Sequence, residues 1–303
     1  MNKGIIYILL SGICFIVVNI FVKILGQGPE QTIIEGIQKY PIPEIILFRS
    51  VITFFMCYAI IRSRGIPLFG NNRKWLIVRG VFGTTALTLF FYTLDNLPIA
   101  IATTVQYLSP IFTVIIAVFL LKEKVKKIQW LFFLIAFAGI VFMGLSKFLS
   151  NDSAVTTINP WWILAGIASA MCAGVSYNAI VKCKNTDAPI TIVMYFPIVA
   201  IPVMAVLTAA DYIVPIGKEW WLLLIIGVFT QFAQVLMTKA LHSDNTATIT
   251  PFKYFGSIYA LFLGLFLFDE VISLYGIAGM VFILIGVLGN TYFRSKKKKT
   301  KLT

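Results

Sequence analysis

Two cationic residues lie inside long apolar runs, where a charge is costly. At 1.5 Å per residue, Arg49 lies about 9 Å and Lys253 about 10 Å from the nearer ends of their runs. A charge near the bilayer centre costs roughly 2.5–3.5 kcal/mol on insertion scales, so it usually has a partner or lines a wet cavity. Both residues could bind a carboxylate or phosphate through charge-assisted hydrogen bonds. A structural alternative stays open, because long cationic side chains also extend to the membrane interface or hold a helix carbonyl.

The neighbourhood of Lys253 favours a binding role. Pro251 removes a backbone donor two residues earlier and interrupts the helical ladder. The pair Gln106 and Tyr107 stands 147 residues before the pair Lys253 and Tyr254. We therefore predict that these two pairs form a binding platform. Aromatic residues in membrane helices also serve in packing or at the interface, and that alternative stays open.

Weaker candidates are amides and a phenol inside apolar runs. Such amides could contact a solute, or they could bind helices together at about 0.6–2 kcal/mol each. The residues concerned are Asn19, Tyr177, Asn178, Gln231 and Gln234.

Residues that could support catalysis or metal binding are sparse and poorly spaced. The sole histidine is His242, and no spacing assembles a catalytic constellation, so we expect no enzyme. The four cysteines lack a C-x-x-C pair, and we expect neither a disulfide framework, nor a metal site, nor a cofactor. Acidic residues fall at the ends of apolar runs or in loops, which argues against a buried carboxylate as a proton carrier; these are Glu44, Asp95, Glu123, Asp244, Asp269 and Glu270. Glu123 and Glu270 are expected to lock helix ends, and Arg79 is expected to meet headgroups or a loop carboxylate.

The elements that position these residues are membrane helices. Hydrophobic residues make up 59% of the 303 residues and charged ones 12%, with a mean hydropathy of +0.91, which leaves too little polar surface for a soluble globule. Most apolar runs have the length of roughly 18 to 25 residues that a helix needs to cross a bilayer. We predict ten spans, at about 4–25, 43–62, 75–94, 98–121, 128–146, 160–182, 188–209, 219–241, 246–268 and 273–293.

The stretch 80–139 repeats as 227–286 without a gap. Fourteen of the sixty aligned positions are identical, among them Tyr107 with Tyr254 and Glu123 with Glu270. Five crossings leave the chain on the opposite face, so a second copy must be inverted. The fold class is therefore predicted as an all-α polytopic membrane protein, with ten transmembrane helices arranged as two inverted five-helix repeats at 1–150 and 151–303.

The distribution of basic residues predicts the orientation. With the N-terminus inside, seventeen of the 25 lysines and arginines fall in inside segments and four in outside ones, as the positive-inside rule requires. Both termini are then cytoplasmic. The basic tail 294–301 is expected to attract anionic lipid, so the net charge of +13 implies no nucleic-acid partner. No targeting extension precedes the first span, and we expect a bacterial inner membrane, with a homodimer as an open partner prediction.

Two sets of motifs stand out in the first half of the chain. They are Pro43-Glu44 with Arg49, and Leu108-Ser109-Pro110 through Leu121-Lys122-Glu123-Lys124 to Gln129 and Gly139. With these motifs the chain resembles the EamA-type members of the drug/metabolite transporter superfamily, and the resemblance covers essentially the whole chain. The second copy replaces the Ser-Pro of the first by Gly256-Ser257. Tyr195 stands at the position of Arg49, so any role of that arginine is not duplicated.

The resemblance implies transport of a small molecule, and the family moves amino acids, nucleotide-sugar-like and other metabolites, and toxic compounds. Together with the two cations, it predicts a secondary-active, alternating-access carrier for a small organic metabolite bearing an anionic or carboxylate group, such as an amino acid or organic acid, with export as the direction. Alternatives are a channel-like facilitator, an exporter of toxic or drug-like compounds, an intramembrane enzyme and a nontransporting scaffold.

Overall fold

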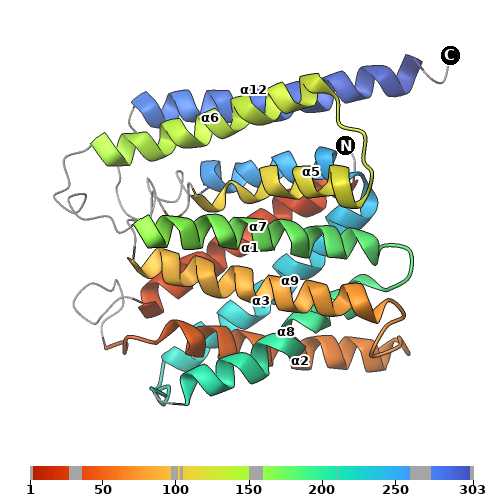
Figure 1. Ribbon diagram of the computed structural model, residues 1–303. Helices are drawn as coiled ribbons and strands as arrows, with labels where there is room; N and C mark the ends of the chain where they lie inside the picture. The colour runs from red at the N-terminus through yellow and green to blue at the C-terminus, as the bar shows by residue number, and fades with distance from the viewer. Residues whose placement is uncertain are drawn as a thin grey trace. The chain divides into compact units, whose positions relative to one another are not determined.

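The computed structural model describes residues 3–26, 36–96, 102, 105–149, 160–209, 211–259 and 274–300. The regular structure of these residues is helical throughout and includes no strand (Figure 1). The predicted all-α membrane fold is confirmed. The helices are α1 (Lys3–Gly26), α2 (Ile42–Ser63), α3 (Arg73–Asn96), α5 (Ser109–Leu120), α6 (Lys127–Leu149), α7 (Pro160–Lys182), α8 (Pro189–Thr208), α9 (Glu219–Ser243), α10 (Thr246–Ile249), the 3-10 helix η2 (Thr250–Tyr254) and α12 (Leu274–Thr300).

The long helices follow the predicted spans closely. Within the described residues, six are long and apolar enough to cross a membrane: α1, α2, α7, α8, α9 and Arg73–Leu94 of α3. Shorter apolar stretches are Ser109–Leu120, Lys127–Phe142 and Ile277–Asn290. The parts of the predicted spans at 98–101 and 260–268, and Asp269 and Glu270, lie outside the described residues.

The chain divides into two compact units that do not follow the predicted halves. Unit 1 comprises Met1–Thr88 and Val175–Ser243, and unit 2 comprises Leu89–Gly174 and Asp244–Thr303. Each unit therefore combines segments from before and after residue 150, and the two repeats stay a prediction about the sequence.

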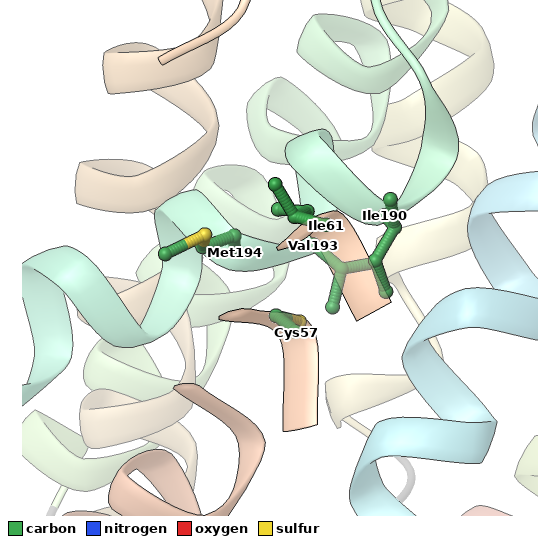
Figure 2. Packing of buried hydrophobic residues seen from close by; sticks show 5 residues of the cluster. All are labelled: Cys57, Ile61, Ile190, Val193 and Met194. Carbon is green, nitrogen blue, oxygen red and sulfur yellow. The ribbon is translucent and has the colours of Figure 1, made fainter. Parts of the chain in front are cut away.

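In unit 1, α2 packs against α8 and α9, and α1 packs against α9. Both α2 and α8 carry a proline in their first turn, where the missing N–H costs no helical hydrogen bond. Buried side chains of α2 and α8 form a shared apolar cluster, shown in Figure 2: Cys57, Ile61, Ile190, Val193 and Met194. This cluster packs α2, which carries Arg49, against α8, which carries Phe196.

In unit 2, α6 and α12 lie side by side along their length (Figure 1). Glycines allow the close approach. A Cβ at Gly139 would lie 2.5 Å from the Gly279 carbonyl oxygen, and a Cβ at Gly286 would lie 2.6 Å from the Ala136 amide nitrogen. Gly139 and Gly286 are partners in the predicted repeat, and each faces the helix of the other. Such reciprocal contacts are what two-fold pseudo-symmetry would produce.

Candidate functional site

The ten predicted site residues fall into two groups, one in each compact unit. Asn19, Arg49, Tyr177, Asn178, Gln231 and Gln234 belong to unit 1, and Gln106, Tyr107, Lys253 and Tyr254 belong to unit 2.

Arg49 is buried about two turns into α2, at 3.6 residues per turn. Its side chain is only 2% exposed, and its guanidinium carbon lies 5.5 Å from the ring centroid of Phe196 on α8. Within the described residues, its Nε has no hydrogen-bond partner and its guanidinium forms no ion pair. Arg49 is therefore held by a ring and not by a carboxylate.

Arg79 on α3 is the second buried cation, and the prediction that it meets headgroups or a loop carboxylate is wrong. It is 2% exposed, and its guanidinium carbon lies 5.6 Å from the same Phe196 centroid. Nη1 donates to Ser176 Oγ and Nη2 donates to Gln234 Oε1, each at 2.8 Å. The two acceptors belong to α7 and α9, so the side chain points among helices instead of toward lipid headgroups.

Arg79 lies deeper in its helix than predicted, because the predicted span begins at residue 75, whereas α3 begins at Arg73. Measured from residue 75, Arg79 is close enough to the helix end for its long side chain to extend to the membrane interface. A signal was present in the sequence, since two small residues follow: a Cβ at Gly83 would overlap the Arg79 guanidinium, and a Cβ at Gly80 would lie 2.5 Å from the Tyr195 carbonyl oxygen. Glycine at these positions leaves room for a buried guanidinium beside α8.

We call Arg49, Arg79, Phe196, Ser176 and Gln234 the arginine site. The two positive charges are close enough to act on each other, and the Tyr177 phenol interacts electrostatically with Arg79. Two buried cations cost roughly 5–7 kcal/mol on insertion scales. Two desolvated cation–π contacts return about 4 kcal/mol. The acceptors on Ser176 and Gln234 are neutral, so the arginine site keeps an uncompensated positive charge among the described residues.

The other candidates in unit 1 differ in burial and in hydrogen bonding. Gln231 is 2% exposed and exchanges hydrogen bonds with the Cys57 thiol at 3.2 and 3.3 Å, which connects α9 to α2. Asn178 is fully buried, whereas Asn19 is exposed. The two asparagines therefore do not occupy equivalent environments.

In unit 2 the two predicted tyrosines meet. The ring centroids of Tyr107 and Tyr254 lie 6.2 Å apart at an interplanar angle of 63°. Tyr254 is fully buried, and its hydroxyl has no hydrogen-bond partner in the described part of the chain. Gln106 is half-buried and accepts a hydrogen bond from Ser169 Oγ at 3.1 Å, while Lys253 is half-buried on η2. The structure thus brings the two repeat-related pairs together through their rings.

Both of these segments depart from regular α-helix at the tyrosines. A turn at residues 107–108 precedes α5, and α10 passes into the 3-10 helix η2, which contains Pro251. The predicted interruption by Pro251 is confirmed. A 3-10 stretch within a helical segment often marks a hinge. Interrupted helices at corresponding positions of two repeats are typical of transporter binding sites.

The carboxylates are more buried than their positions at helix ends suggested. Glu44 is fully buried, with Oε2 accepting from the Ile213 amide at 3.1 Å and Oε1 without a partner among described residues. Glu219 accepts from the Gln38 amide at 2.7 Å and from the Tyr40 hydroxyl at 2.5 Å. Burial and the Glu219 carboxylate raise the pKa of the Tyr40 hydroxyl. Glu44 lies in the first turn of α2, at a helix end as predicted, and its carboxylate is nevertheless buried against the loop at Ile213.

Glu123 behaves as expected for a residue that locks helix ends. Its two oxygens accept from the amides of Thr246 and Ala247 at 3.1 and 3.4 Å. These amides open α10, where the first N–H groups have no partner within the helix. A carboxylate at this end also complements the helix dipole. Glu123 therefore holds the start of the segment that carries Lys253.

The fold and the buried cations define an all-α membrane protein with polar side chains placed between its helices. The EamA-like transporter family matches residues 2–145 and 160–292, and the chain belongs to this family. Each matched stretch falls within one predicted half. Membership makes the chain a transporter of the drug/metabolite transporter superfamily and an integral membrane protein, and not an enzyme.

Known transporters match nearly the full length. The pseudopaline exporter CntI of Pseudomonas aeruginosa is 28% identical over 299 residues, covering 98% of this chain and 98% of that protein. The S-adenosylmethionine uptake transporter of Rickettsia prowazekii is 23% identical over 296 residues, covering 96% of each. A solved crystal structure with 16% identity matches with a TM-score of 0.77 over 97% of this chain and 98% of its own, which shows the fold alone.

Proposed function

We propose that this chain is a secondary-active carrier that exports a small organic metabolite bearing an anionic or carboxylate group. The observation that carries the proposal is the arginine site: two buried guanidiniums contact one ring, and no described carboxylate neutralises them. A solute anion would supply the missing charge through charge-assisted hydrogen bonds. Amino acids and organic acids have the required group.

The relatives support a solute of metabolite size and differ in direction. One is named as an exporter and another as an uptake transporter. The proposal of export follows the P. aeruginosa relative, which has the higher identity of the two. The repeat supports alternating access, in which one half moves against the other around a central site.

The proposed setting is a bacterial inner membrane with both termini cytoplasmic. The helix α12 continues to Thr300 through the lysine run, so the basic residues extend directly from a membrane helix. Anionic headgroups would attract that run and hold it on the cytoplasmic side. A homodimer is compatible with this arrangement and would be tested by mass measurement in detergent.

A ligand screen followed by uptake tests the proposal. The purified protein is heated with amino acids, organic acids, phosphate esters and matched neutral or cationic compounds, and its unfolding midpoint is recorded. Ligands that bind only the folded state raise that midpoint. The proposal expects anionic hits that are then taken up by proteoliposomes with saturation and counterflow. Hits confined to cationic or neutral compounds would contradict it, and flux without saturation or counterflow would indicate a channel.

A further inference from the structure

Five helices contribute side chains to the arginine site. Arg49 comes from α2, Arg79 from α3, Ser176 from α7, Phe196 from α8 and Gln234 from α9. Both guanidinium carbons lie within 6 Å of the Phe196 centroid, at 5.5 and 5.6 Å. The two cations therefore share one aromatic neighbour.

The two arginines are held in different ways. Arg79 is oriented by Ser176 and Gln234, which accept from its two terminal nitrogens. Arg49 makes no such hydrogen bond with the described residues, and its Nε is buried without a partner. A guanidinium carries five N–H donors and no acceptor, so both side chains retain donors for a ligand. Arg79 is preorganised by its two acceptors, whereas Arg49 keeps its Nε donor for a second group.

The charge of the site sets the charge of its ligand. Two guanidiniums remain ionised in proteins, and within the described residues neither forms an ion pair. A ligand with one negative charge would leave one buried cation uncompensated, whereas a ligand with two would neutralise both. Guanidinium also matches the planar geometry of a carboxylate.

Within the described residues, the arginine site has no second copy at the repeat-related positions. Tyr195 stands at the repeat position of Arg49, and Ile226 stands 147 residues after Arg79. Neither cation is duplicated, so the second half supplies the ring on α8 and the amide on α9 instead of a second pair of charges. One ligand per chain follows from this asymmetry.

Resting on the proposed function, we propose that Arg49 and Arg79 form one binding site for an organic dianion of the dicarboxylate class. The ring of Phe196 contacts both guanidiniums, and Gln234 orients Arg79. One carboxylate pairs with each guanidinium. Gln234 and Ser176 are positioning residues that hold Arg79 in place while the ligand is absent.

Matched ligands and variants test this inference by equilibrium binding to the purified full chain. Succinate and butyrate share a four-carbon chain and differ by one carboxylate. The wild type should bind succinate about tenfold or more tightly than butyrate, the effect of one charge-assisted contact, with one ligand per chain. Arg49→Gln and Arg79→Gln should each abolish this preference. Arg64→Gln, a change at an exposed arginine, should leave it intact.

Gln234→Glu provides a test that does not depend on removing an arginine. The new carboxylate would stand beside Arg79 and neutralise one charge within the protein, so the preference should change from succinate toward butyrate without loss of the folded state. Retention of the succinate preference in Gln234→Glu or Arg79→Gln would overturn the dianion site. If Arg49→Gln alone abolished binding of both acids, a one-cation site would replace it and the proposed function would stand. Failure of the wild type to bind or transport any organic anion would overturn both.

Discussion

At the residue scale, the depth of a cation in a membrane helix does not show what its side chain contacts. Arg79 donates to Ser176 and Gln234 as well as lying over the ring of Phe196, whereas Arg49 contacts that ring without such hydrogen bonds. Lys253 differs from both because it is half-buried on a 3-10 helix. Each of the three therefore calls for its own test.

Lys253→Ala should weaken the apparent affinity for transport of the anionic solute by about tenfold or more while leaving the folded protein intact. The lysine lies next to Tyr254, whose ring contacts Tyr107 at the interruption of both helical segments. Loss of a charge-assisted contact weakens binding by about tenfold or more. Uptake into proteoliposomes measures the effect, with Lys253→Arg as the charge-preserving control. Unchanged flux in Lys253→Ala would remove this residue from the site.

Glu219→Gln should lower the free energy of unfolding by about 1–3 kcal/mol. The carboxamide of glutamine has only one accepting oxygen, so it cannot accept all of the hydrogen bonds that this buried carboxylate now receives. Its oxygens receive hydrogen bonds from Gln38, Tyr40 and Ile216. Thermal unfolding in detergent measures the loss. Asp211→Asn, a change at an exposed acid in the same loop region, is the matched control. Equal midpoints for the two variants would refute the structural role of Glu219.

At the element scale, the sequence predicted the long helices well and the local geometry within them less completely. Length and hydropathy are enough to place α1, α2, α7, α8 and α9 to within a few residues, because crossing a bilayer demands a long apolar run. Pro251 correctly marked the 3-10 interruption. The turn at residues 107–108, which directly precedes Ser109 and Pro110, was not predicted.

Side-chain burial at the ends of helices could not be predicted from position. Glu44 and Arg79 both lie near a helix terminus in sequence, where contact with water or headgroups is the usual expectation. Each is instead covered by segments distant along the chain: Glu44 by the loop at Ile213, and Arg79 by α7 and α9. A single sequence without its tertiary contacts does not contain this information.

Gly139→Ala should destabilise the pair formed by α6 and α12. The added Cβ would lie 2.5 Å from the Gly279 carbonyl oxygen, so the helices must separate and lose packing. Overpacking of this kind typically costs about 1–3 kcal/mol. The unfolding midpoint measures it, against Gly26→Ala at the end of α1, where an added Cβ meets nothing within 4 Å. A midpoint as high as that of the control would show that the two helices tolerate separation.

At the scale of the whole molecule, the chain belongs to the EamA-like transporter family, and its sequence predicts an inverted repeat. The family model matches residues 2–145 and 160–292, and the compact units each draw on both stretches. Interleaving of this kind is compatible with two inverted halves whose corresponding helices pack together, as α6 and α12 do. The orientation of the halves in the membrane is open to direct measurement.

Cysteine labelling in intact cells should place Lys124 and Lys218 on opposite faces of the membrane. Both side chains are exposed, Lys124 in the loop between α5 and α6 and Lys218 in the turn before α9, so a cysteine at either position is reachable. In a background without the four native cysteines, Lys218→Cys should react with a membrane-impermeant maleimide, and Lys124→Cys should react only after the cells are opened. Labelling of both from outside would contradict the predicted topology.

Counterflow of a dicarboxylate, measured in proteoliposomes containing the wild type, Arg49→Gln or Arg64→Gln, shows most directly whether the arginine site binds the transported solute. Saturable counterflow is expected for the wild type and for Arg64→Gln, and apparent affinity weaker by about tenfold or more for Arg49→Gln, because only Arg49→Gln removes a buried cation from the arginine site. Counterflow of equal rate and saturation in Arg49→Gln would contradict the claim that this site binds the transported anion.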